Sequence, residues 1–216
     1  MLTFNKDEAV RADAMSSQIN TSGKYVGVIT RAEKLISKSG SQGLGISFKS
    51  DTGETADYLD LWILNAQGEQ LISMKHAQAI MGCAGVRQAK DGKIEIEVYN
   101  KESKKREKKL VDGYPDLMGK RIGLLLQAEL DNYGGKDRTK MQIYNVFQDK
   151  TELTISEILD KKTKPELLAK FEERLAAIPV KDVRKNLNKN SSQQQPSGFS
   201  VQQSNATEDD DTDLPF

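Results

Sequence analysis

Histidine, cysteine and long apolar segments are scarce in this sequence of 216 residues. The single cysteine, Cys83, excludes a disulfide within the chain and is typical of a reducing compartment, where it would be a small buried residue. The single histidine, His76, has no second histidine or other cysteine with which to bind a metal, and no phosphate-binding loop, dinucleotide-binding turn or G-x-S-x-G motif is present. No run of about 18 apolar residues could span a bilayer, and acidic residues stand where a signal peptide is apolar. We therefore expect a cytoplasmic, non-enzymatic protein that needs no cofactor or metal.

Net charge is also absent, because 32 basic residues balance 32 acidic ones. The balance hides an asymmetry along the chain. Residues 186–216 contain one basic and five acidic residues, which leaves 31 basic and 27 acidic residues in residues 1–185. A basic body with an acidic terminus is typical of nucleic-acid-binding proteins.

Alternating apolar residues between 24 and 64 predict half-buried strands. In residues 56–64, "ADYLDLWIL", the odd positions form an apolar face, whereas Tyr58, Asp60 and Trp62 point to the opposite side. Asp57 and Asp60 are the nearest candidates for a magnesium-dependent nuclease, but the polar face of a strand explains them more simply. Two large aromatic side chains on a face that should meet solvent indicate a binding surface.

The order of the predicted elements indicates a mainly β fold with minor α content. Three strands are followed by a helix at 73–85 and by further strands, with a hairpin around 93–110. This order is expected of an OB-fold-like five-stranded barrel with an inserted β-hairpin, and a β-sandwich of another topology is the alternative. Thr163 and Glu166 have capping-box spacing and predict a C-terminal helix over 163–178.

Proteins that bind single strands combine aromatic rings, on which bases stack, with basic side chains that follow the phosphates. Residues 101–109 contain six basic and two acidic residues, and further basic residues follow the glycine turn at 134–135. A solvated hairpin tip is the simpler explanation of such a run. The predicted DNA-binding residues are Lys49, Tyr58, Trp62, Lys104, Lys105, Arg106, Lys136, Arg138, Lys140 and Tyr144.

The last eight residues, "DDDTDLPF", follow a polar linker rich in Asn, Gln and Ser that has too few apolar residues to fold. This arrangement resembles the C-terminal tip of bacterial single-stranded DNA-binding proteins, which docks its terminal Phe into a pocket of partner enzymes. The resemblance implies an electrostatic part and an apolar docking part. The first comprises Asp209, Asp210, Asp211 and Asp213, and the second comprises Leu214, Pro215 and Phe216.

The whole chain resembles a single-stranded DNA-binding protein encoded by a phage or mobile element, acting in a bacterial host cell. We expect largely sequence-independent binding during DNA replication, recombination and repair, with the tip recruiting host or phage enzymes; homo-oligomerisation is left open. The alternatives are a single-strand annealing protein or recombination mediator, and a protein-binding adaptor. The expected parts are an N-terminal extension (1–22), an OB-like DNA-binding domain (23–150), a helical segment (151–185), a disordered linker (186–207) and the acidic tip (208–216).

Overall fold

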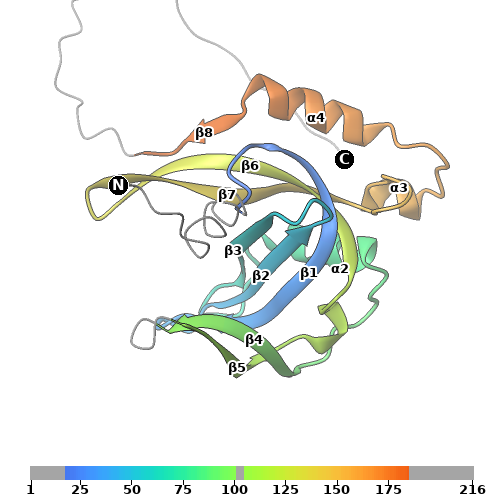
Figure 1. The fold of residues 1–216 in the computed structure, drawn as a ribbon. Coiled ribbons are helices and arrows are strands. Elements are labelled where there is room, and N and C mark those ends of the chain that lie inside the picture. Colours follow the sequence, from blue (N-terminus) through green and yellow to red (C-terminus); the bar gives the residue numbers. More distant parts are fainter. Residues whose placement is uncertain (1–17, 101–104, 185–216) are drawn as a thin grey trace, which may run out of the picture. The chain divides into compact units, whose positions relative to one another are not determined.

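The fold is mainly β, as the sequence predicts. The computed structural model describes residues 18–100 and 105–184. Figure 1 shows the arrangement of the strands and of the few helices. The strands are β1 (Gly23–Ile36), β2 (Gln42–Ser50), β3 (Thr55–Leu64), β4 (Gly92–Asn100), β5 (Lys105–Gly113), β6 (Arg121–Tyr133), β7 (Lys136–Phe147) and β8 (Val180–Asp182). The helices are α2 (Met74–Cys83), α3 (Ile155–Leu159), α4 (Leu167–Ala177) and the short 3-10 helix η1 (Pro115–Leu117).

The long strand β1 organises the sheet, because three other strands pair with different parts of it. β2 pairs with Gly27–Ile36, β6 pairs with Gly23–Val28, and β5 meets β1 at Glu33, all in antiparallel orientation. β3 lies beyond β2, β4 beyond β5, and β7 beyond β6. β8 pairs in parallel orientation with residues 128–130 of β6, just beyond the residues of β6 that pair with β1. Within the described ranges no strand ladder joins β3 to β7, so the sheet is open at this seam.

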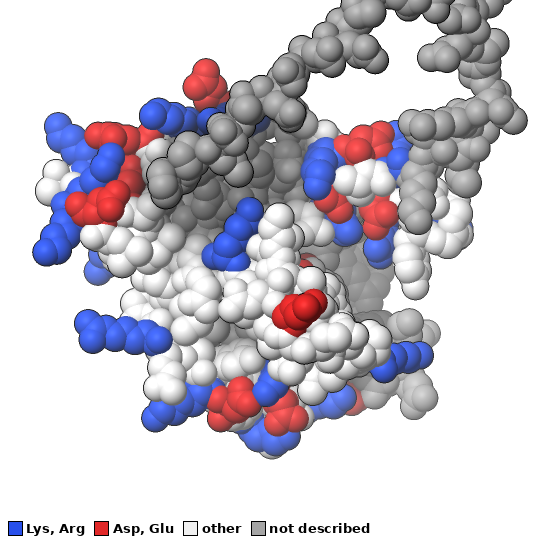
Figure 2. Space-filling view, turned by 180° about the vertical axis from the view of Figure 1, so that it is seen from behind, with Lys and Arg blue, Asp and Glu red and all other residues white. Residues whose placement is uncertain are grey.

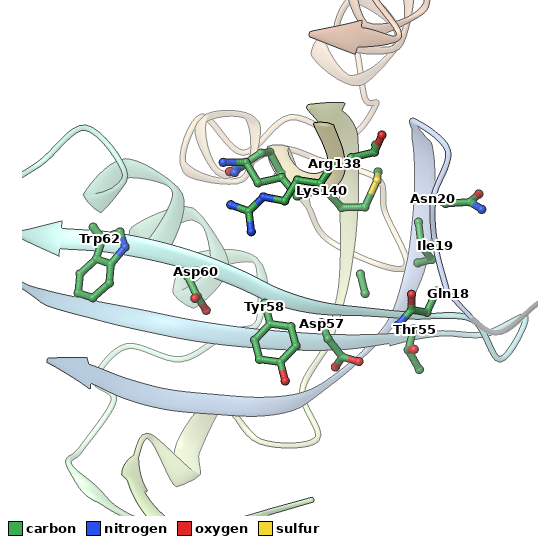
Figure 3. A pocket seen from close by; sticks show the side chains of 14 residues that line it. Gln18, Ile19, Asn20, Thr55, Asp57, Tyr58, Asp60, Trp62, Arg138 and Lys140 are labelled. Carbon is green, nitrogen blue, oxygen red and sulfur yellow. The ribbon is translucent and has the colours of Figure 1, made fainter. Parts of the chain in front are cut away.

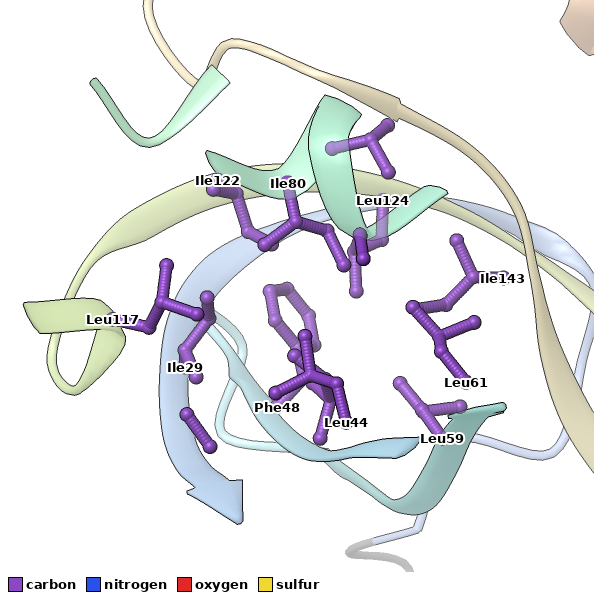
Figure 4. Packing of buried hydrophobic residues seen from close by; sticks show 14 of the residues in the cluster. Ile29, Leu44, Phe48, Leu59, Leu61, Ile80, Leu117, Ile122, Leu124 and Ile143 are labelled. Carbon is purple, nitrogen blue, oxygen red and sulfur yellow. The ribbon is translucent and has the colours of Figure 1, made fainter. Parts of the chain in front are cut away.

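The main core fills the space between the inner faces of β1, β2, β3, β6 and β7 and helix α2 (Figure 4). Cys83 at the end of α2 is buried there, as predicted, and burial raises the pKa of its thiol to about 12. Ile19, which precedes β1, is also buried in this core. Side chains of the core include Ile29, Leu44, Ile46, Phe48, Leu59, Leu61, Ile80, Leu117, Ile122, Leu124 and Ile143.

A second, smaller core joins α4 to the outer face of β6 and β7. Leu168 and Leu175 of α4 are buried together with Leu125 of β6 and Phe147 of β7. Phe171 and other partly buried residues pack against them. Ile178, the residue that follows α4, is 60% exposed.

The capping box predicted at Thr163 is wrong, because α4 begins at Leu167 and its preceding residue Glu166 makes no side-chain cap. The capping box lies instead at α3, between Thr154 and Glu157. The second carboxylate oxygen of Glu157 accepts the backbone N–H groups of Glu166 and Leu167 at 2.7 and 2.9 Å. One buried carboxylate therefore caps both helices, which the local spacing could not reveal.

The segment after residue 150 also contains the edge strand β8, which the sequence did not predict. Hydrogen bonds at both ends hold it against β6. Gln127 Nε2 donates to the carbonyl oxygen of Ile178 at 2.7 Å, and the N–H group of Val183 donates to the carbonyl oxygen of Leu130 at 2.9 Å. In the described part of the chain, none of the helices is both long and apolar enough to cross a membrane.

Candidate nucleic-acid interface

The outer face of β1, β2 and β3 forms a shallow surface, here called the trough, whose middle strand carries small residues. β2 places Gly43, Gly45 and Ser47 on this face, between larger side chains of its two neighbours. The pairing sets Glu33 of β1 and Asp60 of β3 on either side of Gly45. Leu35 and Trp62 flank Gly43 in the same way.

Gly43 and Gly45 leave space that side chains of the two neighbouring strands occupy. A Cβ at Gly43 would stand 3.1 Å from the Trp62 indole and 3.4 Å from Leu35 Cβ. A Cβ at Gly45 would stand 3.2 Å from both the Arg31 guanidinium and Leu35. Contacts this short would force the neighbours to shift by a few tenths of an ångström, so the glycines leave room for Trp62, Leu35 and Arg31 over the middle strand. The indole, 38% exposed, therefore keeps part of its surface open to a ligand.

Tyr58 stands higher above the trough, because β3 bulges at this residue. The register with β2 shifts between Ile46 and Phe48, so that Asp57 and Tyr58 together oppose the single residue Ser47. Tyr58 has φ 59°, a left-handed conformation that is strained for an aromatic residue. Its side chain is 73% exposed, and the Arg31 guanidinium lies 5.4 Å from the ring centroid. Bulges often redirect a side chain next to a functional site.

The predicted alternation of β3 is confirmed. Leu59 and Leu61 are 2% and 4% exposed on the inner face, whereas Tyr58, Asp60 and Trp62 are exposed on the outer face. Figure 3 shows these three side chains in a row along β3, with Arg138 and Lys140 of β7 across the hollow from them. The structure thus brings together two predicted aromatic residues and two predicted basic ones.

Three adjoining hollows follow the trough. One of about 620 Å³ fills the open seam between β3 and β7. Hollows of about 270 and 450 Å³ lie between β1–β3 and the β4–β5 hairpin. Asp57 lines all three, and Tyr58 lines two, so the hollows form one path across the outer face.

The charges along this path are mixed. Its basic residues are Arg31, Lys49, Lys108, Lys109, Arg138 and Lys140, and its acidic residues are Glu33, Asp57, Asp60, Glu95 and Glu97. On the face of the molecule opposite to the view of Figure 1, basic and acidic side chains are likewise interspersed (Figure 2). The path is therefore only slightly basic.

Acidic neighbours neutralise much of the charge on the β6–β7 ribbon. Lys140 lies 2.9 Å from Glu129, and Arg138 lies 3.1 Å from Asp131. The bond to Arg138 lowers the pKa of Asp131, and Lys140 and Lys181 overcome the effect of burial to lower the pKa of Glu129. Cross-strand register creates these pairs, which the sequence prediction missed.

Tyr133 at the end of the same ribbon is a second residue that the prediction missed. Its ring is 71% exposed, and the Arg138 guanidinium lies 4.7 Å from the ring centroid. Its position before the glycine turn at 134–135, opposite the exposed Lys136, was the signal available in the sequence.

Tyr144 is not part of the trough, which corrects its prediction as a stacking residue. Its ring packs edge-on against Phe171 of α4, with a centroid separation of 6.4 Å. A register shift in the β6–β7 pairing, opposite Leu125 and Leu126, accompanies this orientation. Tyr144 is therefore one of the partly buried residues that pack against the second core.

The remaining predicted residues divide into two groups. Lys49 is exposed at the end of the trough and lines the same hollow as Lys108. Lys105 and Arg106 are placed by their backbone only, opposite Asn100 and Tyr99 in the β4–β5 hairpin. The others lie outside the described residues, namely Lys104 and the tip residues Asp209, Asp210, Asp211, Asp213, Leu214, Pro215 and Phe216.

Residues of metal or nucleophilic chemistry are not gathered at the trough. The described ranges contain no group of three or more His, Cys, Asp or Glu side chains that could hold a metal ion. His76 lies on α2, where burial lowers its pKa, and Cys83 lies in the core. No protein-family model matches the chain, and no curated protein matches it either.

Proposed function

We propose that this protein binds single-stranded DNA along the trough, without catalysis and with little dependence on sequence, during DNA replication, recombination and repair. The observation that carries the proposal is the row of exposed Tyr58 and Trp62 on one face of β3, bordered by basic side chains of two hairpins. Base stacking on such rings contributes about 1–3 kcal/mol per base. Two stacked bases together with a few phosphate contacts are enough for one protein molecule to bind a single strand.

The order of the strands supports an OB-like arrangement. β1, β2 and β3 form a meander, α2 follows β3, β6 returns to pair with β1, and β7 lies beside β6. An OB-fold has this order in its five strands and binds oligonucleotides on the face of its second and third strands. In this proposal the β4–β5 hairpin is an insertion that borders the binding face.

The electrostatic contribution should be small for a single-strand-binding protein. In the described part of the chain, the ammonium groups of Lys49, Lys109 and Lys136 lie in no ion pair, whereas the other basic groups at β7 are paired with carboxylates. Each phosphate contact adds about 0.7 to the slope of log affinity against log salt for single strands. Stacking therefore supplies a larger share of the affinity than charge does.

A titration of Trp62 fluorescence tests the proposal, because Trp62 is the only tryptophan of the chain. Single-stranded oligonucleotide should quench its emission, and a duplex of the same length should do so only weakly. Binding without quenching, seen by a labelled oligonucleotide, would exclude Trp62 from the interface. Faster annealing of complementary strands would favour an annealing protein, and no binding at low salt would favour an adaptor.

The C-terminal tip is proposed to recruit replication, recombination and repair enzymes of the host or phage, on the resemblance of its sequence. Removing residues 208–216 should abolish this recruitment, and it should tighten DNA binding at low salt because the acids no longer compete with phosphates. Phe216→Ala keeps every charge and should remove recruitment alone. Recovery of the same partners from a bacterial lysate with and without Phe216 would leave the tip a solubilising function only.

A further inference from the structure

Asp60 lies between the two aromatic side chains on which bases would stack. It shares the outer face of β3 with Tyr58 and Trp62 and is exposed (Figure 3). Across the sheet it faces Gly45, which has no side chain to cover it. Its carboxylate is therefore open at the level of the rings.

Among residues 18–100 and 105–184, no side chain or backbone group pairs with this carboxylate. Within the described residues it takes part in no hydrogen bond or ion pair, because Arg31 is held by Glu33 at 2.8 Å and lies over the Tyr58 ring. The surrounding side chains withdraw enough water to raise the pKa of Asp60, an effect that Arg31 partly offsets. A partly desolvated, unpaired carboxylate gains free energy from a ligand that donates a hydrogen bond to it.

A phosphate cannot be that ligand, since the like charges repel. The ligand at this level is the edge of a base, and an ionised carboxylate only accepts hydrogen bonds. Cytosine, adenine and guanine offer an exocyclic amino group, as in the pairing of acidic side chains with the N4 amino group of cytosine. Thymine has no such group, and two carbonyl oxygens flank its one ring N–H.

We propose that Asp60 makes the trough prefer bases with an exocyclic amino group, so that cytosine binds more tightly than thymine. This preference rests on the proposed binding of single strands and adds a base discrimination to it. The two pyrimidines have rings of one size, and the additional C5-methyl group of thymine can only increase its stacking area, so tighter binding of cytosine cannot come from stacking.

Fluorescence titration with oligo-dC and oligo-dT of equal length, at pH 7.5 and one salt concentration, tests the preference. The unmodified protein should bind oligo-dC about fivefold more tightly. Asp60→Asn, whose amide both donates and accepts, should bring the ratio close to one. Asp57→Asn removes the same charge from the same trough and should keep the ratio.

The outcomes separate the two proposals. Equal affinity of the unmodified protein for the two oligomers would overturn the preference and leave single-strand binding intact. Loss of the ratio in Asp57→Asn but not in Asp60→Asn would overturn the assignment to Asp60. Binding of neither oligomer would overturn the proposed function itself. Asp60→Thr, a residue suited to strands, replaces the asparagine variant if the latter melts early, and it too should lower the ratio.

Discussion

The outer surface of the sheet is covered by a helix over β6 and is exposed over β3. Over β6, α4 covers the strand with Leu168 and Leu175, and Glu157 satisfies the ends of two helices. Over β3, aromatic rings are exposed, Tyr58 is strained, and the Asp60 carboxylate has no partner in the described part of the chain. The covered surface stabilises the fold, whereas the open surface keeps exposed rings, backbone strain and an unpaired carboxylate that add no such packing.

The largest effect on stability should come from removing the Glu157 carboxylate beneath the covered surface. Glu157→Ala leaves the N–H group of the buried Thr154 and the partly buried N–H groups of Glu166 and Leu167 without this acceptor, and we expect a loss of about 3 kcal/mol in unfolding free energy. Urea denaturation measures this loss. Glu173→Ala on the exposed side of α4 is the matched control. An equal, small loss in both variants would contradict the role of Glu157.

The same carboxylate predicts a pH dependence. Burial alone would raise the pKa of Glu157, but the backbone N–H groups that it accepts lower it from 4.5 to about 2. Because folding lowers this pKa, the stabilisation is complete above pH 4.5 and is lost as the pH falls toward 2. The difference in stability between the unmodified protein and Glu157→Gln should therefore shrink between pH 5 and pH 3.

Trp62→Ala should lower the affinity for single strands by about 1–3 kcal/mol, because one base can no longer stack on the indole. Trp62→Phe keeps an aromatic face and should retain most of the affinity. A labelled oligonucleotide reports binding in both variants, since they lack the tryptophan signal. Unfolding of Trp62→Ala, seen by circular dichroism, would show that the indole acts mainly in packing over Gly43.

Tyr58→Gly sharpens the comparison, because stability and binding should change in opposite directions. Glycine adopts positive φ without strain, so unfolding free energy should rise by about 1 kcal/mol while affinity falls. Tyr58→Ala also removes the ring but keeps the strain, so it should lose affinity without gaining stability. A lower melting temperature for the glycine variant would mean that the Arg31–Tyr58 contact outweighs the strain.

The smallest effect is expected from charge. Lys49→Ala with Lys109→Ala should make the salt dependence of binding shallower by about 1.4 in log–log slope, because two side chains no longer meet phosphates. Lys170→Ala on α4 removes an exposed charge from the covered side and should leave the slope unchanged. An unchanged slope in the double variant would place the phosphates elsewhere.

Local sequence was sufficient for the face of β3 and for α2, because strand and helix periodicities involve only neighbouring residues. The spacing of Tyr58 and Trp62 predicted their exposure, and the helix predicted at 73–85 is α2. The mainly β class followed from the same periodicities. The capping-box spacing at Thr163 failed because another carboxylate, nine residues before Glu166, already accepts the N–H groups that open α4.

The sequence by itself determined which face of β3 is apolar. Only the tertiary structure decided which surfaces are covered and which charges are paired. Packing of α4 placed Phe171 against the ring of Tyr144, a candidate stacking residue, and pairing of β6 with β7 brought Arg138 and Lys140 to Asp131 and Glu129. The physical reason is that burial and ion pairing depend on groups brought together from distant parts of the chain, whereas alternation depends on the strand alone.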